Sequence, residues 1–167
     1  MGQYYGLPTF GLAGASDAKI PDEQAAAEAA CSLLVESLSG MNLIHDIGYL
    51  ESGKCYSVEQ LVICDDLIGY VKRFTQDFEV TDETLALDLI MELGTASDYL
   101  KHPHTLQHYR EDWYPRLFDR NGFERWAASG HQTLRERARA RVNKLLAQPQ
   151  PEPPAPALER EICEILN

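Results

Sequence analysis

Residues 4–24 read "YYGLPTFGLAGASDAKIPDEQ", in which an apolar run is followed by a polar loop and then by a helix start. The run from Tyr5 to Phe10 suits a strand. Glycines at 6, 11 and 14 interrupt it before Ala-Ser-Asp-Ala-Lys, and Pro21-Asp22-Glu23 has the proline and acids typical of a first helical turn. This order of strand, loop and helix is that of a βα unit.

The same order is repeated after the predicted helix 21–39, which Gly40 ends. Leu43 to Ile47 form a second strand-like run, and Ser57 then caps a helix with Gln60 as its capping-box partner. The two strands lie about 38 residues apart, which fits the right-handed crossover of parallel α/β folds. We therefore predict a parallel pair of strands with both outer edges unpaired within the monomer.

The rest of the chain is predicted to be helical, without further strands. Its segments are one helix over 81–94, short helices and turns over 102–130, a basic amphipathic helix over 131–148, a proline-rich linker in polyproline conformation over 149–156, and a last helix over 158–166. The basic helix is expected to be a solvated face with i,i+4 ion pairs. The expected division is 1–80 for the βα units, 81–147 for a helical extension, and 148–167 for the linker and terminal helix.

Charge and hydropathy exclude several classes of partner. Fifteen Lys and Arg stand against 26 Asp and Glu, a net charge of -11, which would repel nucleic acid. No run approaches the roughly eighteen apolar residues of a membrane span, and the N-terminus lacks the pattern of a signal peptide. These observations predict a cytoplasmic protein without nucleic-acid or membrane partners.

Neither the cysteines nor the histidines form a complete set of metal ligands. Cys31, Cys55, Cys64 and Cys163 are far apart in the chain and form no CxxC pair, so we expect buried or idle thiols. His104 and His108 have the i,i+4 spacing of two ligands on one helix, but no third ligand of known spacing accompanies them. We predict no structural metal.

Polar residues follow both strands, where parallel α/β folds place their chemistry. The loops "GLAGASDAK" and "HDIGYLESG" offer Asp17, Lys19, His45, Asp46, Tyr49 and Glu51. Carboxylates and an aromatic ring at one mouth could hold a cationic ligand, which predicts substrate contacts by Asp17, Lys19, Asp46 and Tyr49. His45 and Glu51 are the candidate catalytic residues, since either could move a proton. The alternative is that Asp17 and Asp46 only cap or brace turns.

Several blocks of the sequence resemble one known family. In order they are "QYYGLPTFGLAGASDAKIPDEQA", "NLIHDIGYLESG", "SVEQLVICDDLIG", "TDETLALDLI" and "HPHTLQHYREDWYPRLFDR". From about residue 3 to 146 the chain is similar to the C-terminal part of the trimethylamine and glycine betaine methyltransferases, which transfer a methyl group to a corrinoid protein. The resemblance implies a role in methylamine metabolism, including methanogenesis.

The resemblance also implies a fold and partners. The full-length family members are (β/α)8 barrels, and this chain is similar to their last βα units and helical C-terminal extension. The implied substrate is a small methylated amine, bound at the barrel mouth. The corrinoid is carried by a partner protein, so this chain is expected to bind no cofactor directly. Binding and orientation of the amine would then carry the catalysis.

One position departs from the trimethylamine-specific pattern. Those members have pyrrolysine just before the Ser-Asp-Ala-Lys segment, and the equivalent residue here is Gly14. Glycine supplies no electrophilic imine. The resemblance therefore points to the branch without pyrrolysine, which uses quaternary amines such as glycine betaine.

Two strands make only a small part of a barrel, so the chain is expected to be inactive alone. We expect it to associate with a complementary N-terminal chain or with itself through the apolar flanks of Leu7, Phe10, Leu43 and Ile47. The alternative is a non-catalytic truncated paralogue that serves only as an association module.

Overall fold

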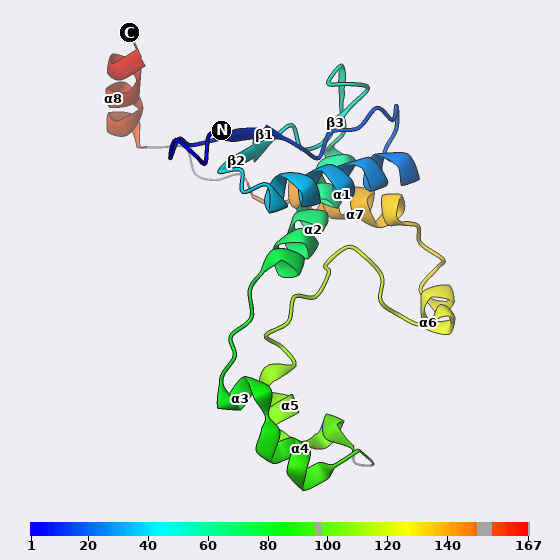
Figure 1. The fold of residues 1–167 in the computed structure, drawn as a ribbon. Helices are drawn as coiled ribbons and strands as arrows, with labels where there is room; N and C mark the ends of the chain where they lie inside the picture. Colours follow the sequence, from blue (N-terminus) through cyan, green and yellow to red (C-terminus); the bar gives the residue numbers. More distant parts are fainter. Residues whose placement is uncertain (96–97, 150–154, 167) are drawn as a thin grey trace.

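The computed structural model describes residues 1–95, 98–149 and 155–166, which form a mixed α/β chain (Figure 1). The elements in order are β1 Phe10–Leu12, α1 Glu23–Leu38, β2 Leu43–His45, β3 Tyr49–Leu50, β4 Cys55–Tyr56, α2 Val58–Thr75, α3 Asp82–Leu85, α4 Leu87–Leu93, the 3-10 helix η1 Tyr99–Lys101, α5 Pro103–His108, α6 Phe123–Ala128, α7 Leu134–Leu146 and α8 Pro156–Leu166. The described strands form two small two-stranded sheets.

The predicted parallel pair is confirmed, although both strands are shorter than expected. Phe10 pairs with Leu43, and Leu12 pairs with His45. Strand β1 begins after the predicted Tyr5, because residues 2–6 turn back on themselves through a hydrogen bond from Leu7 N to Gly2 O. Strand β2 ends before Ile47, because Asp46 has a φ of 75° that breaks the extended conformation.

A hairpin that the sequence analysis did not predict follows β2. Tyr49 pairs with Tyr56 and Leu50 with Cys55 in the antiparallel sheet β3–β4. The connecting residues Glu51, Ser52 and Gly53 all have positive φ. Glycine readily adopts this conformation, but Glu51 and Ser52 do not, so the sequence did not predict the turn. The hairpin lies between β2 and α2, within the second predicted functional loop.

The core lies where α1 and α2 pack together, with α7 against α2. Its buried side chains come from all three helices and from two loops: Ala13, Ala29, Leu33, Ile63, Cys64, Leu67, Val71, Leu117 and Ala138. The prediction that Ile47 lacks neighbours is wrong, because this side chain is partly buried against the core. The strands lie along one side of α1 (Figure 1).

Only one of the two hydrogen bonds of the predicted capping box of α2 is present. Ser57 Oγ accepts a hydrogen bond from Gln60 N at 3.2 Å. The Gln60 side chain does not return to the cap; it is fully buried and donates to Ala25 O of α1 at 3.1 Å. The interhelical contact therefore replaces the second half of the capping box.

The predicted helix over 81–94 is broken in two. Thr81 and Thr84 form a capping box at its start, but Ala86 has a φ of 48° and separates α3 from α4. Helices α3, α4, η1 and α5, within residues 82–95 and 98–111, stand away from the α1–α2–α7 layer at the end of two extended connections (Figure 1). We call this segment the helical arm.

The last elements are close to prediction. Thr133 and Glu136 form a capping box at the start of α7. The basic helix does not rely on i,i+4 pairs, because Arg139 reaches across to Glu59 of α2 at 3.2 Å. Residues 150–154 of the predicted proline-rich linker lie outside the described residues. No helix in the described part of the chain is long and apolar enough to cross a membrane.

Candidate functional site

The two predicted loops run side by side beyond the ends of β1 and β2. Backbone hydrogen bonds join them in sequence, from Gly48 N to Gly14 O at 3.4 Å, from Ser16 N to Tyr49 O at 3.0 Å, and from Glu51 N to Ala18 O at 3.0 Å. The loops therefore meet as the parallel arrangement requires. Their side chains nevertheless fall into separate clusters.

The first cluster braces the loop that follows β1. Glu28 of α1 accepts hydrogen bonds from Ser16 Oγ at 2.6 Å and from Asp17 N at 2.8 Å. These contacts, that with Ser16 above all, lower the pKa of Glu28. Asp17 Oδ1 in turn accepts a hydrogen bond from Ser52 Oγ of the second loop, and Lys19 Nζ donates to Asp17 O. Asp17 thus has the geometry of a brace between loops.

The second cluster pairs His45 with Asp46 at the end of β2. His45 Nδ1 lies 2.7 Å from Asp46 Oδ1, and the ring stacks on Phe10 with centroids 4.1 Å apart. In the neutral tautomer that donates Nδ1–H to the carboxylate, Nε2 is an acceptor. Nε2 is buried, and no described residue gives it a hydrogen bond. An unsatisfied buried acceptor is costly, so this atom is a place where a donor would bind favourably.

The hairpin supplies a third cluster. The rings of Tyr49 and Tyr56 meet edge to face with centroids 5.3 Å apart, and both are partly open to solvent. Glu51 Oε2 accepts a weak hydrogen bond from Cys55 Sγ at 3.4 Å, which is the largest cause of the raised pKa of that thiol. Among the described residues, no side-chain hydrogen bond joins Glu51 or Tyr49 to the His45–Asp46 pair.

Backbone strain is concentrated in the second loop. Five described non-glycine residues have left-handed φ values, and three of them, Asp46, Glu51 and Ser52, lie here. Each such conformation costs on the order of 1 kcal/mol, and these residues often occur at binding sites. The hairpin turn requires this conformation of Glu51 and Ser52, whereas Asp46 adopts it outside the hairpin.

Gly14 has a backbone conformation that a side chain would strain, and the space beside it is tight. Its φ is 82°, and an added Cβ would lie 3.2 Å from Ile47 Cα. Its carbonyl accepts hydrogen bonds from Gly48 N and from the buried Cys64 thiol. In this conformation the position is built for glycine, and a long side chain would need a rearranged loop.

The outer face of the parallel strands is apolar and uncovered. Phe10, Leu12 and Leu43 are 61%, 60% and 57% exposed, whereas Gly11 on the opposite face is buried beside α1. This confirms the predicted exposure of Phe10 and Leu43, and that of Leu7. Contiguous exposed apolar surfaces of this kind often mark interaction sites.

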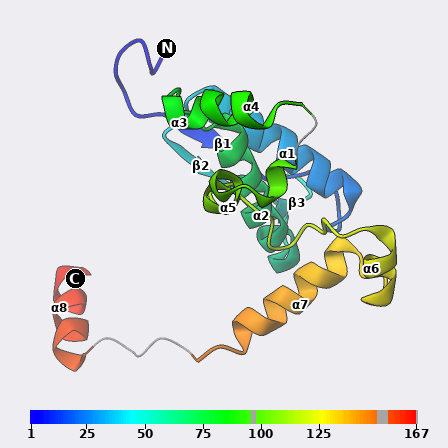
Figure 2. The same ribbon diagram turned by 90° about the horizontal axis from the view of Figure 1, so that it is seen from below.

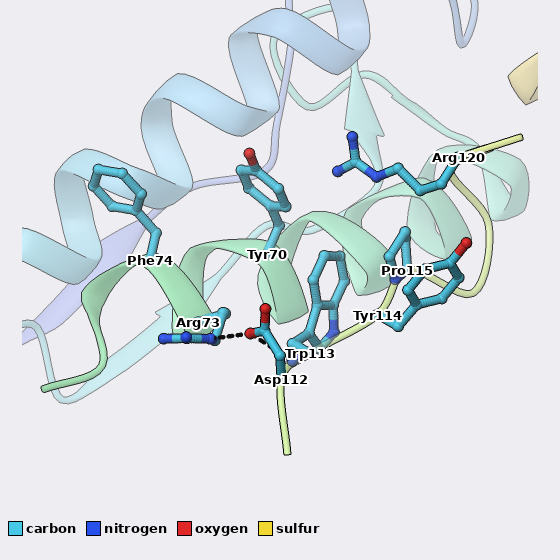
Figure 3. A pocket seen from close by; sticks show the side chains of 8 residues that line it. All are labelled: Tyr70, Arg73, Phe74, Asp112, Trp113, Tyr114, Pro115 and Arg120. Carbon is cyan, nitrogen blue, oxygen red and sulfur yellow. Dashed lines mark hydrogen bonds and ion pairs between the residues drawn. The ribbon is translucent and has the colours of Figure 1, made fainter. Parts of the chain in front are cut away.

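An aromatic hollow of about 640 Å³ lies elsewhere, between α2 and the segment that returns from the arm (Figure 3). Trp113 packs directly on Gly69 and meets Tyr70 edge to face at 5.5 Å. Arg73 is ion-paired with Asp112, and Arg120 lies over the Tyr70 ring. None of the predicted site residues lines this hollow, in which Arg73 is paired with Asp112 and Arg120 is placed against the Tyr70 ring. The contacts of Trp113 and Asp112 around it hold the segment that returns from the arm against α2.

The histidines of the arm already have hydrogen-bond partners, which are two carboxylates for His108 and a backbone carbonyl for His104. His108 contacts Glu111 through Nδ1 at 2.9 Å and Glu83 through Nε2 at 3.1 Å, and His104 Nε2 contacts Glu83 O at 3.0 Å. The hydrogen bonds to Glu111 and then to Glu83 raise the pKa of His108. Among the described residues, no group of three or more His, Cys, Asp and Glu is arranged to hold a metal ion.

Comparison with known proteins gives one consistent result. The family model for trimethylamine methyltransferase matches residues 1–167. This chain belongs to the trimethylamine methyltransferase family. The chain is 38% identical over 146 residues to a trimethylamine methyltransferase of Methanosarcina barkeri, a match that covers 87% of this chain and 30% of that protein.

The similarity extends to members named for different amines. The chain is 36% identical over 138 residues to a trimethylamine methyltransferase of Desulfitobacterium hafniense, covering 83% of this chain and 28% of that protein. It is 29% identical over 164 residues to a glycine betaine methyltransferase of the same species, covering 97% and 33% respectively. The chain thus spans about a third of the length of these relatives.

Sequence reasoning missed several residues of these loops. Glu28 was overlooked because a single acid on a helix resembles a solvated residue. Ser52 and Tyr56 belong to a hairpin whose turn has only one glycine, and the stacking of Phe10 on His45 depends on the register of β1 and β2. The two tyrosines at 49 and 56, which pair across the hairpin, are the sequence feature that could have indicated it.

Proposed function

We propose that this chain supplies one sector of the amine site in an enzyme that transfers a methyl group from a quaternary amine, such as glycine betaine, to a corrinoid protein. The family match over the whole chain carries the proposal. The uncovered face of β1–β2 supports further βα units of a barrel beside these strands, as does the greater length of the relatives. The alternative of a non-catalytic association module rests on the same uncovered face.

The choice of a quaternary amine rests on Gly14. Its φ of 82°, and the closeness of Ile47 to any Cβ added there, favour a loop with glycine rather than pyrrolysine at this position. A quaternary ammonium group has no N–H to donate, so aromatic rings and carboxylates are its suitable partners. Tyr49 and Tyr56 provide two rings, and Asp46 provides a carboxylate near the strand ends.

In this proposal the chain binds and orients the amine, while proton transfer is secondary. The partner's corrinoid would supply the nucleophile, with the electron pair of the broken C–N bond staying on the amine nitrogen. Asp46 and the tyrosines would place the N-methyl group in line for attack. The tertiary amine product later takes up a proton from water, and His45 or Glu51 would relay it.

The test is a chimera in which this chain replaces the matching segment of the Desulfitobacterium glycine betaine methyltransferase. We expect methyl transfer to the corrinoid protein from glycine betaine and none from trimethylamine. Asp46→Asn should lower kcat/KM at least tenfold, about 1.4 kcal/mol, with unchanged melting temperature, and His45→Ala should have a smaller effect because proton transfer is secondary. Asp17→Asn should affect melting and activity together, because Asp17 braces the loops. Preference for trimethylamine, or a folded but inactive chimera, would contradict the proposal.

A further inference from the structure

The helical arm exposes apolar and acidic side chains that could bind another polypeptide. In α3, α4, η1 and α5 no described residue is buried. Met91 and Leu87 are neighbours at i,i+4 spacing on α4 and are 84% and 58% exposed. Asp88 and Glu92 form the adjacent i,i+4 row of the same helix, and both are exposed. The helix α4 therefore presents apolar and acidic rows side by side.

The arm as a whole is acidic. Its acids are Asp82, Glu83, Asp88, Glu92, Asp98 and Glu111, against the bases Lys101 and Arg110. Glu83 and Glu111 contact His108, and Asp98 contacts Lys101. Asp88 and Glu92 have no ion-pair partner among the described residues. Two arms would repel each other, so an arm does not suit another arm as its partner.

The complementary surface lies on α7 of the same chain. This helix carries Arg135, Arg137, Arg139, Arg141 and Lys144 against the single acid Glu136. Arg139 is engaged by Glu59, and Arg137 donates to Leu117 O. Arg141 and Lys144 have no ion-pair partner among the described residues, and Leu145 and Leu146 beside them are exposed. The C-terminal half of α7 thus presents basic and apolar residues side by side.

These two surfaces do not meet within one molecule. In Figures 1 and 2, α4 lies well away from α7, on the far side of α2. We propose that α4 of one copy docks on the C-terminal half of α7 of a second copy, with Asp88 and Glu92 facing Arg141 and Lys144. Exchange in both directions gives a two-fold symmetric dimer with two equal contacts. The same docking covers Leu87 and Met91 with Leu145 and Leu146.

Charge exchange tests this pairing. The Asp88→Lys/Glu92→Lys chain and the Arg141→Glu/Lys144→Glu chain should each dimerise at least tenfold more weakly than the original chain, measured by sedimentation velocity with fluorescent labels. An equimolar mixture should form heterodimers at the original strength, because every contact in the mixed dimer again joins opposite charges. A single chain with all four changes should also recover.

The controls separate docking from folding and from other association. Arg135→Glu, at the opposite end of α7, and Glu124→Lys on α6 should leave dimerisation unchanged. Because Arg141 is only half-exposed, Lys144→Glu alone serves as a second variant if the pair alters the circular dichroism spectrum. Unchanged dimerisation of the charge variants, or a mixture that does not recover, would overturn the proposal. Those results are expected if the chain dimerises through the sheet face, or if the arm binds an unrelated basic protein instead of a second copy.

Discussion

The α1–α2–α7 layer and the helical arm differ in how they are held together. The layer has a continuous apolar core with Leu33 and Ile63 nearly inaccessible to solvent. The arm has no buried residue in its helices, and it is attached through the returning segment by the Arg73–Asp112 ion pair and by the packing of Trp113 on α2. The first region is stabilised by its own burial, whereas the second depends on contacts at its base and on whatever covers it. Substitutions should therefore have very different effects in the two regions.

The largest expected effect is in the layer. Ile63→Ala removes a buried side chain of α2 that lies beside α1 and the start of α7. Large-to-small changes at such sites cost about 2–5 kcal/mol. Leu87→Ala in the arm removes a half-exposed side chain and should cost less than about 0.5 kcal/mol. Urea unfolding followed by circular dichroism measures both. Similar costs at the two positions would mean that the arm has a core of its own.

The next effect concerns the attachment of the returning segment. The buried Asp66 carboxylate accepts hydrogen bonds from the backbone N–H groups of residues 116, 117 and 118 at 2.9, 2.9 and 3.0 Å. Asp66→Ala leaves these donors without an acceptor and should cost about 2–3 kcal/mol. Hydrogen exchange should rise first at 116–118. The exposed neighbour Asp65→Ala is the matched control, and an equal effect there would rule out the specific anchor.

Thiol reactivity distinguishes the layer from exposed surface. Burial raises the pKa of Cys64 to about 11, and the side chain is inaccessible to solvent. Cys31 is exposed. At pH 8, Cys31 should react with a maleimide within minutes, whereas Cys64 should react only after unfolding. Mass spectrometry of labelled peptides gives the order, and rapid labelling of Cys64 in the folded chain would show an open core.

The smallest effect is a pH dependence within the arm. Glu111 and Glu83 raise the pKa of His108 above its ordinary value of about 6.5. The stabilisation of the α3–α5 contact is therefore complete below the unfolded-state pKa and is lost as the pH rises through the higher folded-state pKa. An NMR titration of His108 should show the raised pKa, and Glu111→Gln should lower it. A His108 pKa unaffected by Glu111→Gln would contradict the assigned contact.

The sequence predicted the layer better than the arm, for a physical reason. Helices α1 and α2 have strong caps and apolar spacing, so their bounds and the parallel order of β1 and β2 could be predicted. The break at Ala86 and the hairpin at Tyr49–Tyr56 have no equally strong local signal, since alanine rarely adopts a φ of 48°. The sequence identified the polar residues of both loops. It did not separate them into the Asp17–Glu28 brace and the His45–Asp46 pair, because the brace depends on where α1 places Glu28.

The central claim is that the two loops provide only part of an amine site, and turnover by the chain alone tests it most directly. Methyl transfer from glycine betaine to a reduced corrinoid protein should be undetectable for the isolated 167-residue chain. Two loops leave the amine hydrated, and a misplacement of about 1 Å already costs roughly a hundredfold in rate. The chimera with the Desulfitobacterium enzyme should be active under the same conditions. Turnover by the isolated chain, confirmed as free of other proteins, would contradict the claim and show that these loops suffice.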